Sequence, residues 1–273
     1  MFDKVCLISA AWFIMSYMPP ASLSAFSVIA HRGNSSESPE NTLASFLQAI
    51  ELGVEYIECD IHLTKDKVPV VVHDHILERT TDNNKPLLIN EITAEELSRL
   101  DAGSWYDQSF AGQSIPTLEQ VLKLPFGTTG LMIEIKDESS GEYEIAEAVA
   151  QILLKTPSMP PIVIGSFNPA ILAFVRKLIP QVPIIAIIED LNLLAWHNSN
   201  RPDLYAFDKD IVTKNLIQAA HSENKRVWAW TIDDDKKMEE LAEWGIDGVI
   251  TNYPRAALLI RPRSQIKETV WTK

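Results

Sequence analysis

Three acidic residues stand where neighbouring parallel strands would bring their carboxylates together. Glu58 and Asp60 are two positions apart in an apolar run, so on a β-strand both side chains point to the same face. Glu134 stands near the end of another such run. Carboxylates that share a face repel one another unless a proton or a cation intervenes, and their oxygens suit a hard divalent ion. The three residues therefore predict a metal site for Mg²⁺ or Ca²⁺, with the choice between these ions left open.

Two histidines follow strand-like runs that would end beside these carboxylates. His31 comes directly after the run that ends at Ala30, and His73 follows Val72. An imidazole can take up or release a proton near neutral pH, so one histidine could act as a general base and the other as a general acid. His62 and His75 are weaker candidates for the same site.

The overall charge sets a condition on any phosphate site. The formal net charge is −13 and the 24 Lys and Arg residues are dispersed, so binding of nucleic acid is not expected. An anionic substrate would need local positive charge. Arg32 and Lys136 could supply it, since a guanidinium can bind two phosphate oxygens and an ammonium acts as a point charge. The alternative is that the carboxylates form salt bridges with Arg32 and Lys136 or lie at a wet barrel mouth. That alternative would be favoured for any one carboxylate alone, whereas three converging carboxylates favour the metal site.

The residues above must be positioned by a repeating strand and helix pattern. Short β-rich runs alternate with amphipathic helical patterns, which indicates parallel strands joined by crossover helices. Eight strand segments can be counted, the number in a closed (β/α)8 TIM barrel, whose reactive groups lie at the C-terminal ends of the strands. The segments are Ser27–Ala30, Val54–Asp60, Leu131–Ile135, Ile162–Gly165, Ile184–Ile187, Leu204–Phe207, Arg226–Thr231 and Asp247–Thr251.

One further strand-like run interrupts this rhythm. The run Val68–Val72 follows the second strand after only four residues, which are too few for a parallel crossover. We therefore expect an antiparallel hairpin, with Leu63 opposite Val68 and Asp60 opposite Val71. Lys67 lies in the turn and would be strained if its φ angle had to be positive.

Two segments near the predicted site are less regular. From Asp74 to Ile115 the chain is polar and turn-rich, with one short helical pattern near Ala94–Leu100, and we expect a small insertion that covers the active face. After the seventh strand, Trp230 could contact substrate at the top of the barrel, although a buried aromatic is the more common case. The acidic run Asp233–Asp235 is expected to begin a helix and cap its amides.

One domain accounts for the 273 residues, because no internal repeat or linker divides them. The expected boundaries are a signal peptide at 1–24, the barrel domain at 25–262 and a C-terminal tail at 263–273. The apolar run Val5–Met18 is shorter than the roughly 20 residues of a membrane span, and Ser22 and Ser24 have the spacing of a signal peptidase site. We expect export to the periplasm or the medium, without stable membrane insertion after cleavage. Cys59 would then be the single cysteine, and the oligomeric state is open.

The motifs that contain these residues resemble those of the glycerophosphodiester phosphodiesterase family, in order and in spacing. The resemblance covers nearly all of the expected mature chain. The matching segments are His31-Arg32-Gly33, Pro39-Glu40-Asn41-Thr42, Glu58 to Asp66, His73-Asp74, Glu134-Ile135-Lys136, Gly165-Ser166-Phe167, Val227 to Thr231 and Gly248 to Pro254. Two departures are mild: Cys59 stands where the family often has Leu, and Lys67 where the hairpin usually has Gly.

The resemblance implies a function and a role for each residue. It implies hydrolysis of glycerophosphodiesters to glycerol 3-phosphate and an alcohol through a cyclic intermediate. His31 and His73 would be the acid and base pair, in an order left open. Glu58, Asp60 and Glu134 would bind the metal, and Arg32 and Lys136 the phosphate.

Two alternative functions would require different features of the sequence. A lysophospholipase D or sphingomyelinase D type of enzyme would act on lipids and would need an apolar groove for acyl chains, but the insertion has no strongly apolar run. A non-catalytic barrel that only binds phosphodiesters would be expected to have lost a histidine or a metal ligand, and none is missing.

Overall fold

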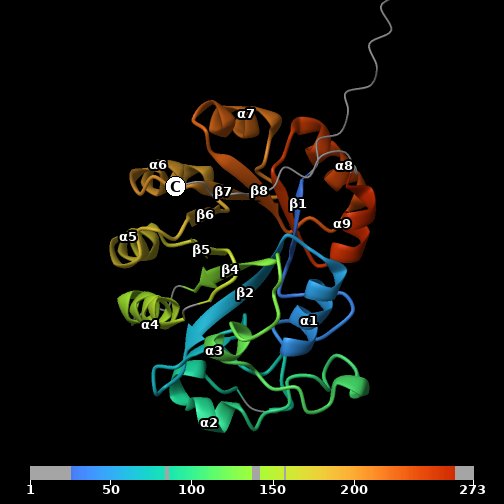
Figure 1. Ribbon diagram of the computed structural model, residues 1–273, viewed down its shortest axis with the longest axis vertical. Helices are drawn as coiled ribbons and strands as arrows, with labels where there is room; N and C mark the ends of the chain where they lie inside the picture. Colours follow the sequence, from blue (N-terminus) through green and yellow to red (C-terminus); the bar gives the residue numbers. More distant parts are fainter. Residues whose placement is uncertain (1–25, 84–85, 137–141, 157, 262–273) are drawn as a thin grey trace, which may run out of the picture.

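The computed structural model describes residues 26–83, 86–136, 142–156 and 158–261 (Figure 1). The expected signal peptide at 1–24 and the tail at 263–273 lie outside these ranges. Within them, no helix has the length and apolar character that crossing a membrane requires. The strands are β1 Ser27–Ala30, β2 Tyr56–Leu63, β3 Pro69–Val71, β4 Gly130–Ile135, β5 Ile162–Ser166, β6 Ile184–Ile188, β7 Leu204–Asp208, β8 Arg226–Trp230 and β9 Gly248–Thr251.

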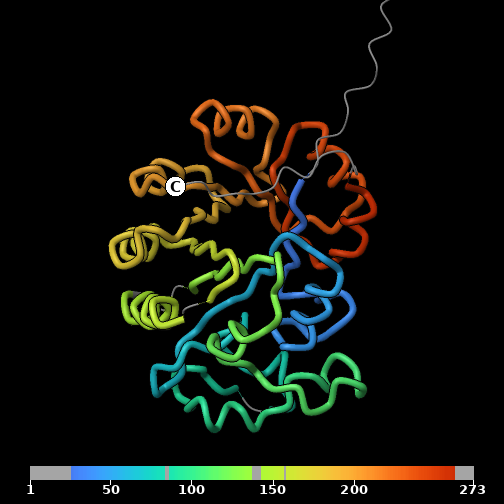
Figure 2. Tube along the Cα trace, viewed as in Figure 1, coloured from blue at the N-terminus to red at the C-terminus, as the bar shows by residue number. Residues whose placement is uncertain are grey.

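Eight of these strands form a closed parallel barrel, which confirms the predicted TIM barrel. The hydrogen-bonded order is β1-β9-β8-β7-β6-β5-β4-β2-β3, and β1 also pairs with β2, so the ring closes with β3 attached outside it. The tube trace makes one circuit, and the first and last strands of the barrel lie side by side (Figure 2). Seven of the eight predicted segments match within two residues at each end; the second extends three residues further, to Leu63.

Helices surround the barrel (Figure 1). They are α1 Leu43–Leu52, α4 Glu142–Lys155, α5 Pro169–Leu178, α6 Leu194–Ser199, α7 Lys214–Ser222, α8 Asp235–Trp244 and α9 Pro254–Ile260. The first shows how the sequence defines a helix: Thr42 caps its N-terminus by accepting from the amide of Ser45, and Gly53 ends it in the left-handed conformation, with φ of 75°.

Two apolar clusters separate the inside of the barrel from its outer layer. The inner cluster includes Ile29, Tyr56, Met132 and Trp228, while the outer cluster includes Cys59 and joins the strands to the helices. Because side chains alternate along a strand, the residues two and four positions after an inward one also point inward. The carboxyl ends of β1, β2 and β4 therefore direct their polar side chains into the mouth of the barrel.

The antiparallel hairpin is present, but its predicted register is wrong by one residue. Ile61 pairs with Val71 and Leu63 with Pro69, rather than Leu63 with Val68. The reason is the turn, which holds three residues instead of four: Thr64 and Val68 close it, with the amide of Thr64 donating to the carbonyl of Val68 at 3.1 Å. Lys67, the last residue of this turn, has φ of 66°. A left-handed residue at this place is typical of three-residue hairpin loops.

The insertion after the hairpin has its own small core and reaches the barrel mouth. It contains the short helices η1 Ile89–Glu91, α2 Ala94–Leu97 and η2 Gln108–Phe110, and α3 Leu118–Val121 leads back to β4. Buried side chains such as Leu77 and Leu97 pack against Val70 of β3. The hydroxyl of Tyr106 donates to the carbonyl of Ser36, in the loop after β1, at 2.7 Å. The insertion therefore contacts the loop after β1, and its role as a cover of the active face stays a prediction.

Candidate active site

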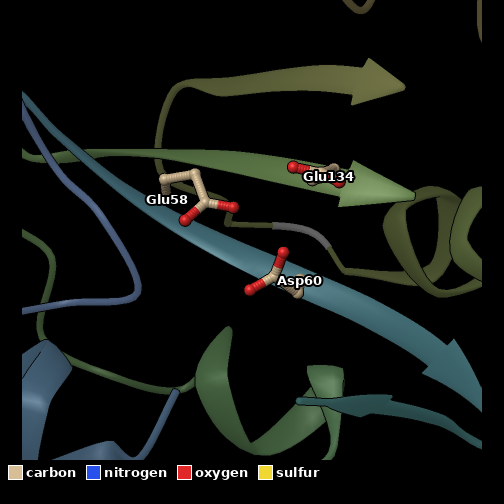
Figure 3. A group of neighbouring side chains, drawn as sticks. All are labelled: Glu58, Asp60 and Glu134. Atoms are coloured by element: carbon tan, nitrogen blue, oxygen red, sulfur yellow. The ribbon is translucent and has the colours of Figure 1, made fainter. Parts of the chain in front are cut away.

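The three predicted metal ligands lie together at the mouth of the barrel (Figure 3). Glu58 and Asp60 come from β2 and Glu134 from β4, and Asp60 is the direct cross-strand partner of Glu134. One carboxylate oxygen of each lies within 4.8 Å of the others. The side chains are buried, with 2%, 1% and 8% of the residue surface exposed for Glu58, Asp60 and Glu134. They follow the inward positions of Tyr56 and Met132, which explains why they converge.

The three carboxyl groups differ in the direction in which their pKa values are shifted. Burial, together with the charges of Asp60 and Glu134, raises the pKa of Glu58 well above its ordinary value. Burial also raises the pKa of Glu134. The pKa of Asp60 is lowered, because the Lys136 ammonium and the Arg32 guanidinium outweigh the effect of burial on this group. Three buried carboxylates thus exceed the positive charge that the side chains provide, and a cation would relieve the excess.

Two cations contact the cluster, so the expected phosphate contacts also form salt bridges. The Nζ of Lys136 lies 2.8 Å from Asp60 Oδ1 and 2.5 Å from Glu134 Oε1. The backbone amide of Arg32 donates to Glu58 Oε2 at 3.0 Å, and its guanidinium Nε lies 3.4 Å from Asp60 Oδ2. A salt-bridge role and a phosphate-binding role are compatible for Arg32 and Lys136, because both roles require positive charge beside the carboxylate cluster.

The donor set fits a hard divalent metal ion. Within the described residues, Glu58 Oε1 is buried and has no hydrogen-bond partner. Such an orphaned oxygen among three acidic side chains is what Mg²⁺ or Ca²⁺ would bind. Asn41 holds one ligand in place, since its Nδ2 donates to Asp60 Oδ2 at 2.8 Å. Asn41 lies in a motif that the resemblance included, but its contact with Asp60 was not predicted.

His31 lies in the loop after β1, next to the carboxylates. Its Nε2 is 3.9 Å from Glu58 Oε2 and accepts a hydrogen bond from Arg32 Nε at 3.2 Å. Its Nδ1 is 2.7 Å from Asn252 Oδ1. Burial, with the neighbouring Arg32 charge, lowers the pKa of His31 to about 4. The loop packs closely: a side chain at Gly33 would meet Ser45 Oγ at 2.3 Å, so only glycine fits there.

His73 lies in the segment that directly follows β3. Its Nδ1 is 2.7 Å from Asp74 Oδ1, and its backbone carbonyl accepts from His62 Nε2 at 3.0 Å. His62 is therefore a support for this segment, with His75 beside it at a ring separation of 6.1 Å. Both imidazoles lie close enough to Asp60 that a proton on either ring would help to lower the pKa of this carboxyl group.

An arginine in the insertion, which we had not predicted as a site residue, connects the two histidine loops. Arg79 Nε donates to Asp74 Oδ2 at 2.5 Å, and its NH1 and NH2 groups donate to Glu40 at 2.8 Å. Glu40 also accepts from Arg32 NH1 at 2.8 Å. The chain Arg32, Glu40, Arg79 and Asp74 therefore joins His31's neighbour to His73. In sequence, Arg32, Glu40 and Asp74 lie in matching motifs, whereas no motif signalled Arg79.

Trp230 lies inside the barrel, on the same face of β8 as Trp228. Trp228 is buried, with 3% of its surface exposed, and packs on Tyr56 at a ring separation of 5.2 Å. Trp230 is half-buried; its Nε1 donates to the carbonyl of Ala206 at 3.0 Å, and its ring meets Phe167 edge to face at 5.3 Å. Its contact with substrate stays a prediction.

Comparisons with known proteins give similarities over almost the whole domain. A family profile described as the glycerophosphoryl diester phosphodiesterase family matches residues 31–256. A glycerophosphodiester phosphodiesterase of Caldanaerobacter subterraneus is 34% identical over 235 residues, covering 85% of this chain and 96% of the relative. One of Bacillus altitudinis is 30% identical over 247 residues, covering 86% and 97%.

A solved structure adds a similarity in three dimensions. An Oleispira antarctica phosphodiesterase, in complex with its product sn-glycerol-3-phosphate, superposes with a TM-score of 0.81 at 29% identity. The match covers 86% of this chain and 96% of that one.

Proposed function

This chain belongs to the glycerophosphoryl diester phosphodiesterase family, and from that premise we propose that it hydrolyses glycerophosphodiesters with His31 and His73 as proton carriers and a divalent metal ion held by Glu58, Asp60 and Glu134. The observation that carries the proposal is the convergence of three carboxylates and two imidazoles at one barrel mouth. Enzymes of this kind cleave a phosphodiester, and every group required for that chemistry lies in this place.

The substrate can supply its own nucleophile. A glycerophosphodiester has a hydroxyl on the carbon next to the esterified one, and one histidine takes its proton as the oxygen attacks phosphorus. The other histidine donates a proton to the departing alcohol as its bond to phosphorus breaks. Water then opens the cyclic phosphate with the two histidines in reversed roles. The products are glycerol 3-phosphate and the free alcohol.

The positive groups stabilise the phosphate during both steps. Arg32 and Lys136 each contact Asp60 at the edge of the cluster, and positive charge at this point supports a role in binding phosphate oxygens. When bound, the metal ion would supply positive charge for the oxygens that become more negative in the transition state. Removing either histidine should lower turnover roughly 10²- to 10⁴-fold, the usual contribution of general acid and base catalysis.

The first experiment measures release of glycerol 3-phosphate from glycerophosphocholine by the purified protein, with Mg²⁺, with Ca²⁺ and with chelator. We expect release that depends on the metal ion and that falls in the His31→Ala and His73→Ala variants. No release under any condition, with a lysophospholipid cleaved instead, would replace this proposal with the lipid-directed alternative. Unchanged turnover in either variant would refute the assigned histidine role.

Export is part of the proposal. The apolar run at 5–18 and the small residues Ser22 and Ser24 support a signal peptide that ends at residue 24. Mass spectrometry of the protein recovered from its host should find a mature chain beginning at Ala25. A chain that keeps residues 1–24 would contradict cleavage at this point.

A further inference from the structure

A chain of hydrogen bonds runs from the surface to His31 across three adjacent strand ends. Asp233 follows β8, Asn252 follows β9 and His31 follows β1, and these strands are neighbours in the barrel. Asn252 Nδ2 donates to Asp233 Oδ2 at 2.7 Å, and Asn252 Oδ1 lies 2.7 Å from His31 Nδ1. We propose that Asp233 and Asn252 are positioning residues, which hold His31 in the tautomer that carries its proton on Nδ1. This inference rests on the proposed catalytic role of His31.

The direction of each hydrogen bond follows from the charged groups at the two ends of this hydrogen-bonded series, Asp233 and Arg32. An ionised carboxylate only accepts, so the Asn252 amide must turn its NH₂ group toward Asp233 and its oxygen toward His31. His31 Nδ1 must then donate. At the other side of the ring, Arg32 Nε lies 3.2 Å from His31 Nε2, and a guanidinium only donates. Both neighbours therefore require the same tautomer, with the lone pair on Nε2 beside Glu58.

Asp233 is free for this role because it does not cap the following helix. The acidic run 233–235 was expected to cap a helix, but Asp234 alone is the N-cap of α8, accepting from the amide of Lys237. The Asp233 carboxylate turns to β9 instead. It accepts from the backbone amide of Asn252 at 2.9 Å and from the hydroxyl of Thr251, a buried residue, at 3.0 Å. These contacts fix its position relative to the strand end.

The effect of Asp233 on His31 is geometric. Asp233 is exposed to solvent, which screens its charge, so it cannot act mainly through its electric field. What it controls is the orientation of the Asn252 amide. The Ser35 hydroxyl also lies 3.0 Å from Asn252 Oδ1, but a hydroxyl can donate to an oxygen or accept from an NH₂ group, so it does not set this orientation. A rotated Asn252 would present its NH₂ group to Nδ1, which would move the proton of His31 to Nε2 and remove the lone pair from the catalytic side.

The most direct test exchanges the residue types at positions 233 and 252. In Asp233→Asn the new amide faces the NH₂ group of Asn252 with its own, so Asn252 should rotate, and kcat should fall about tenfold with KM changed less than about twofold. The double variant D233N/N252D restores a donor at 233 and an acceptor at 252, so kcat should return to within about threefold of wild type. Asp234→Asn is the matched control, because among the described contacts this neighbouring carboxylate binds only the end of α8, at the amide of Lys237. Its kcat should not change.

The tautomer itself can be observed on the full-length protein without relying on activity. The protein has 6 histidines, so ¹⁵N-histidine NMR spectra at about pH 8, where an ordinary imidazole is neutral, would be assigned by comparison with His31→Asn. His31 should be protonated on Nδ1 in the wild type and the double variant, and on Nε2 in Asp233→Asn. An Nε2-protonated His31 in the wild type, an unchanged tautomer in Asp233→Asn, or additive losses in the double variant would overturn the inference. If the wild type did not cleave glycerophosphocholine, the proposed function would fail while these spectra still decided the tautomer.

Discussion

Asp74 accepts a hydrogen bond from His73, with its Oδ1 2.7 Å from the imidazole Nδ1. This carboxylate fixes the tautomer of His73 directly, since it can only accept, and the lone pair of the neutral imidazole is therefore on Nε2. Its second oxygen is bound by Arg79, and the Arg79 and His73 hydrogen bonds outweigh burial and lower the pKa of Asp74. The two histidines proposed to carry protons thus contact different groups, a neutral amide for His31 and a carboxylate for His73.

The first prediction concerns Arg79, which ties Asp74 to Glu40. Arg79→Gln cannot bind both carboxylates through a planar guanidinium, so His73 and Arg32 should lose part of their orientation. We expect kcat for glycerophosphocholine to fall about ten- to hundredfold, part of what acid and base catalysis contributes. Arg99→Gln is the matched control, because Arg99 lies in the same insertion and binds only the exposed Glu95 within the described contacts. Equal activity of the two variants would contradict a role for Arg79.

Most of the site could be predicted because it depends on strand geometry. Alternation along a strand places Glu58 and Asp60 on one face, and the closed parallel barrel brings the end of β4, with Glu134, beside them. These rules hold whatever the loops do. The same alternation places Cys59 on the opposite face, where it joins the outer core.

The contacts that were missed depend on loops whose paths the sequence pattern does not specify. Arg79 meets Glu40 across 39 residues of chain, and Asn252 meets His31 across 221. Neither pairing follows from a period of two or of 3.6 residues, because each needs the actual course of an irregular segment. The predicted hairpin register was wrong for a related reason. Four residues were expected in the turn, and the residue pattern does not show that Lys67 adopts the left-handed conformation of a three-residue turn.

The second prediction tests the metal site by stability. In the wild type, Mg²⁺ or Ca²⁺ should raise the free energy of unfolding, by about 2.7 kcal/mol at a hundredfold excess over Kd. Glu58→Gln removes a ligand, and it also removes a buried carboxylate whose pKa is raised by burial and by its acidic neighbours. The variant should therefore lose the metal-induced shift, while in chelator it should be at least as stable as the wild type.

Thermal unfolding with and without the ion measures both effects. Glu119→Gln, at an exposed position in the first turn of α3, is the control and should keep the full metal-induced shift. A shift of wild-type size in Glu58→Gln would show that Glu58 does not bind the ion.

The third prediction concerns pH and His31. Burial, then the Arg32 charge, lowers its pKa to about 4 in the folded protein, from about 6.5 in an unfolded chain. Between these values the unfolded state binds more protons, so stability rises with pH and is lost as pH falls from about 6.5 toward 4. In chelator, this loss should be on the order of 2 kcal/mol larger for the wild type than for His31→Asn. Urea unfolding across this pH range measures it, and parallel curves for the two proteins would contradict the shift.

The fourth prediction separates two effects at Lys67. Its φ of 66° is unfavourable for a residue with a side chain, whereas its ammonium lies 2.6 Å from Glu144 in an exposed ion pair. Lys67→Ala removes the ion pair but keeps the strain, and should cost at most about 1 kcal/mol. Lys67→Gly removes both and should be more stable than Lys67→Ala by about 0.5–1 kcal/mol, since glycine adopts positive φ freely but loses more entropy on folding. Urea unfolding of the two variants gives the difference directly. An alanine variant as stable as the glycine variant would mean that the turn stores no backbone strain. The kcat should stay unchanged in both variants, because the side-chain contact of Lys67 among the described residues is with Glu144, away from the proposed site residues.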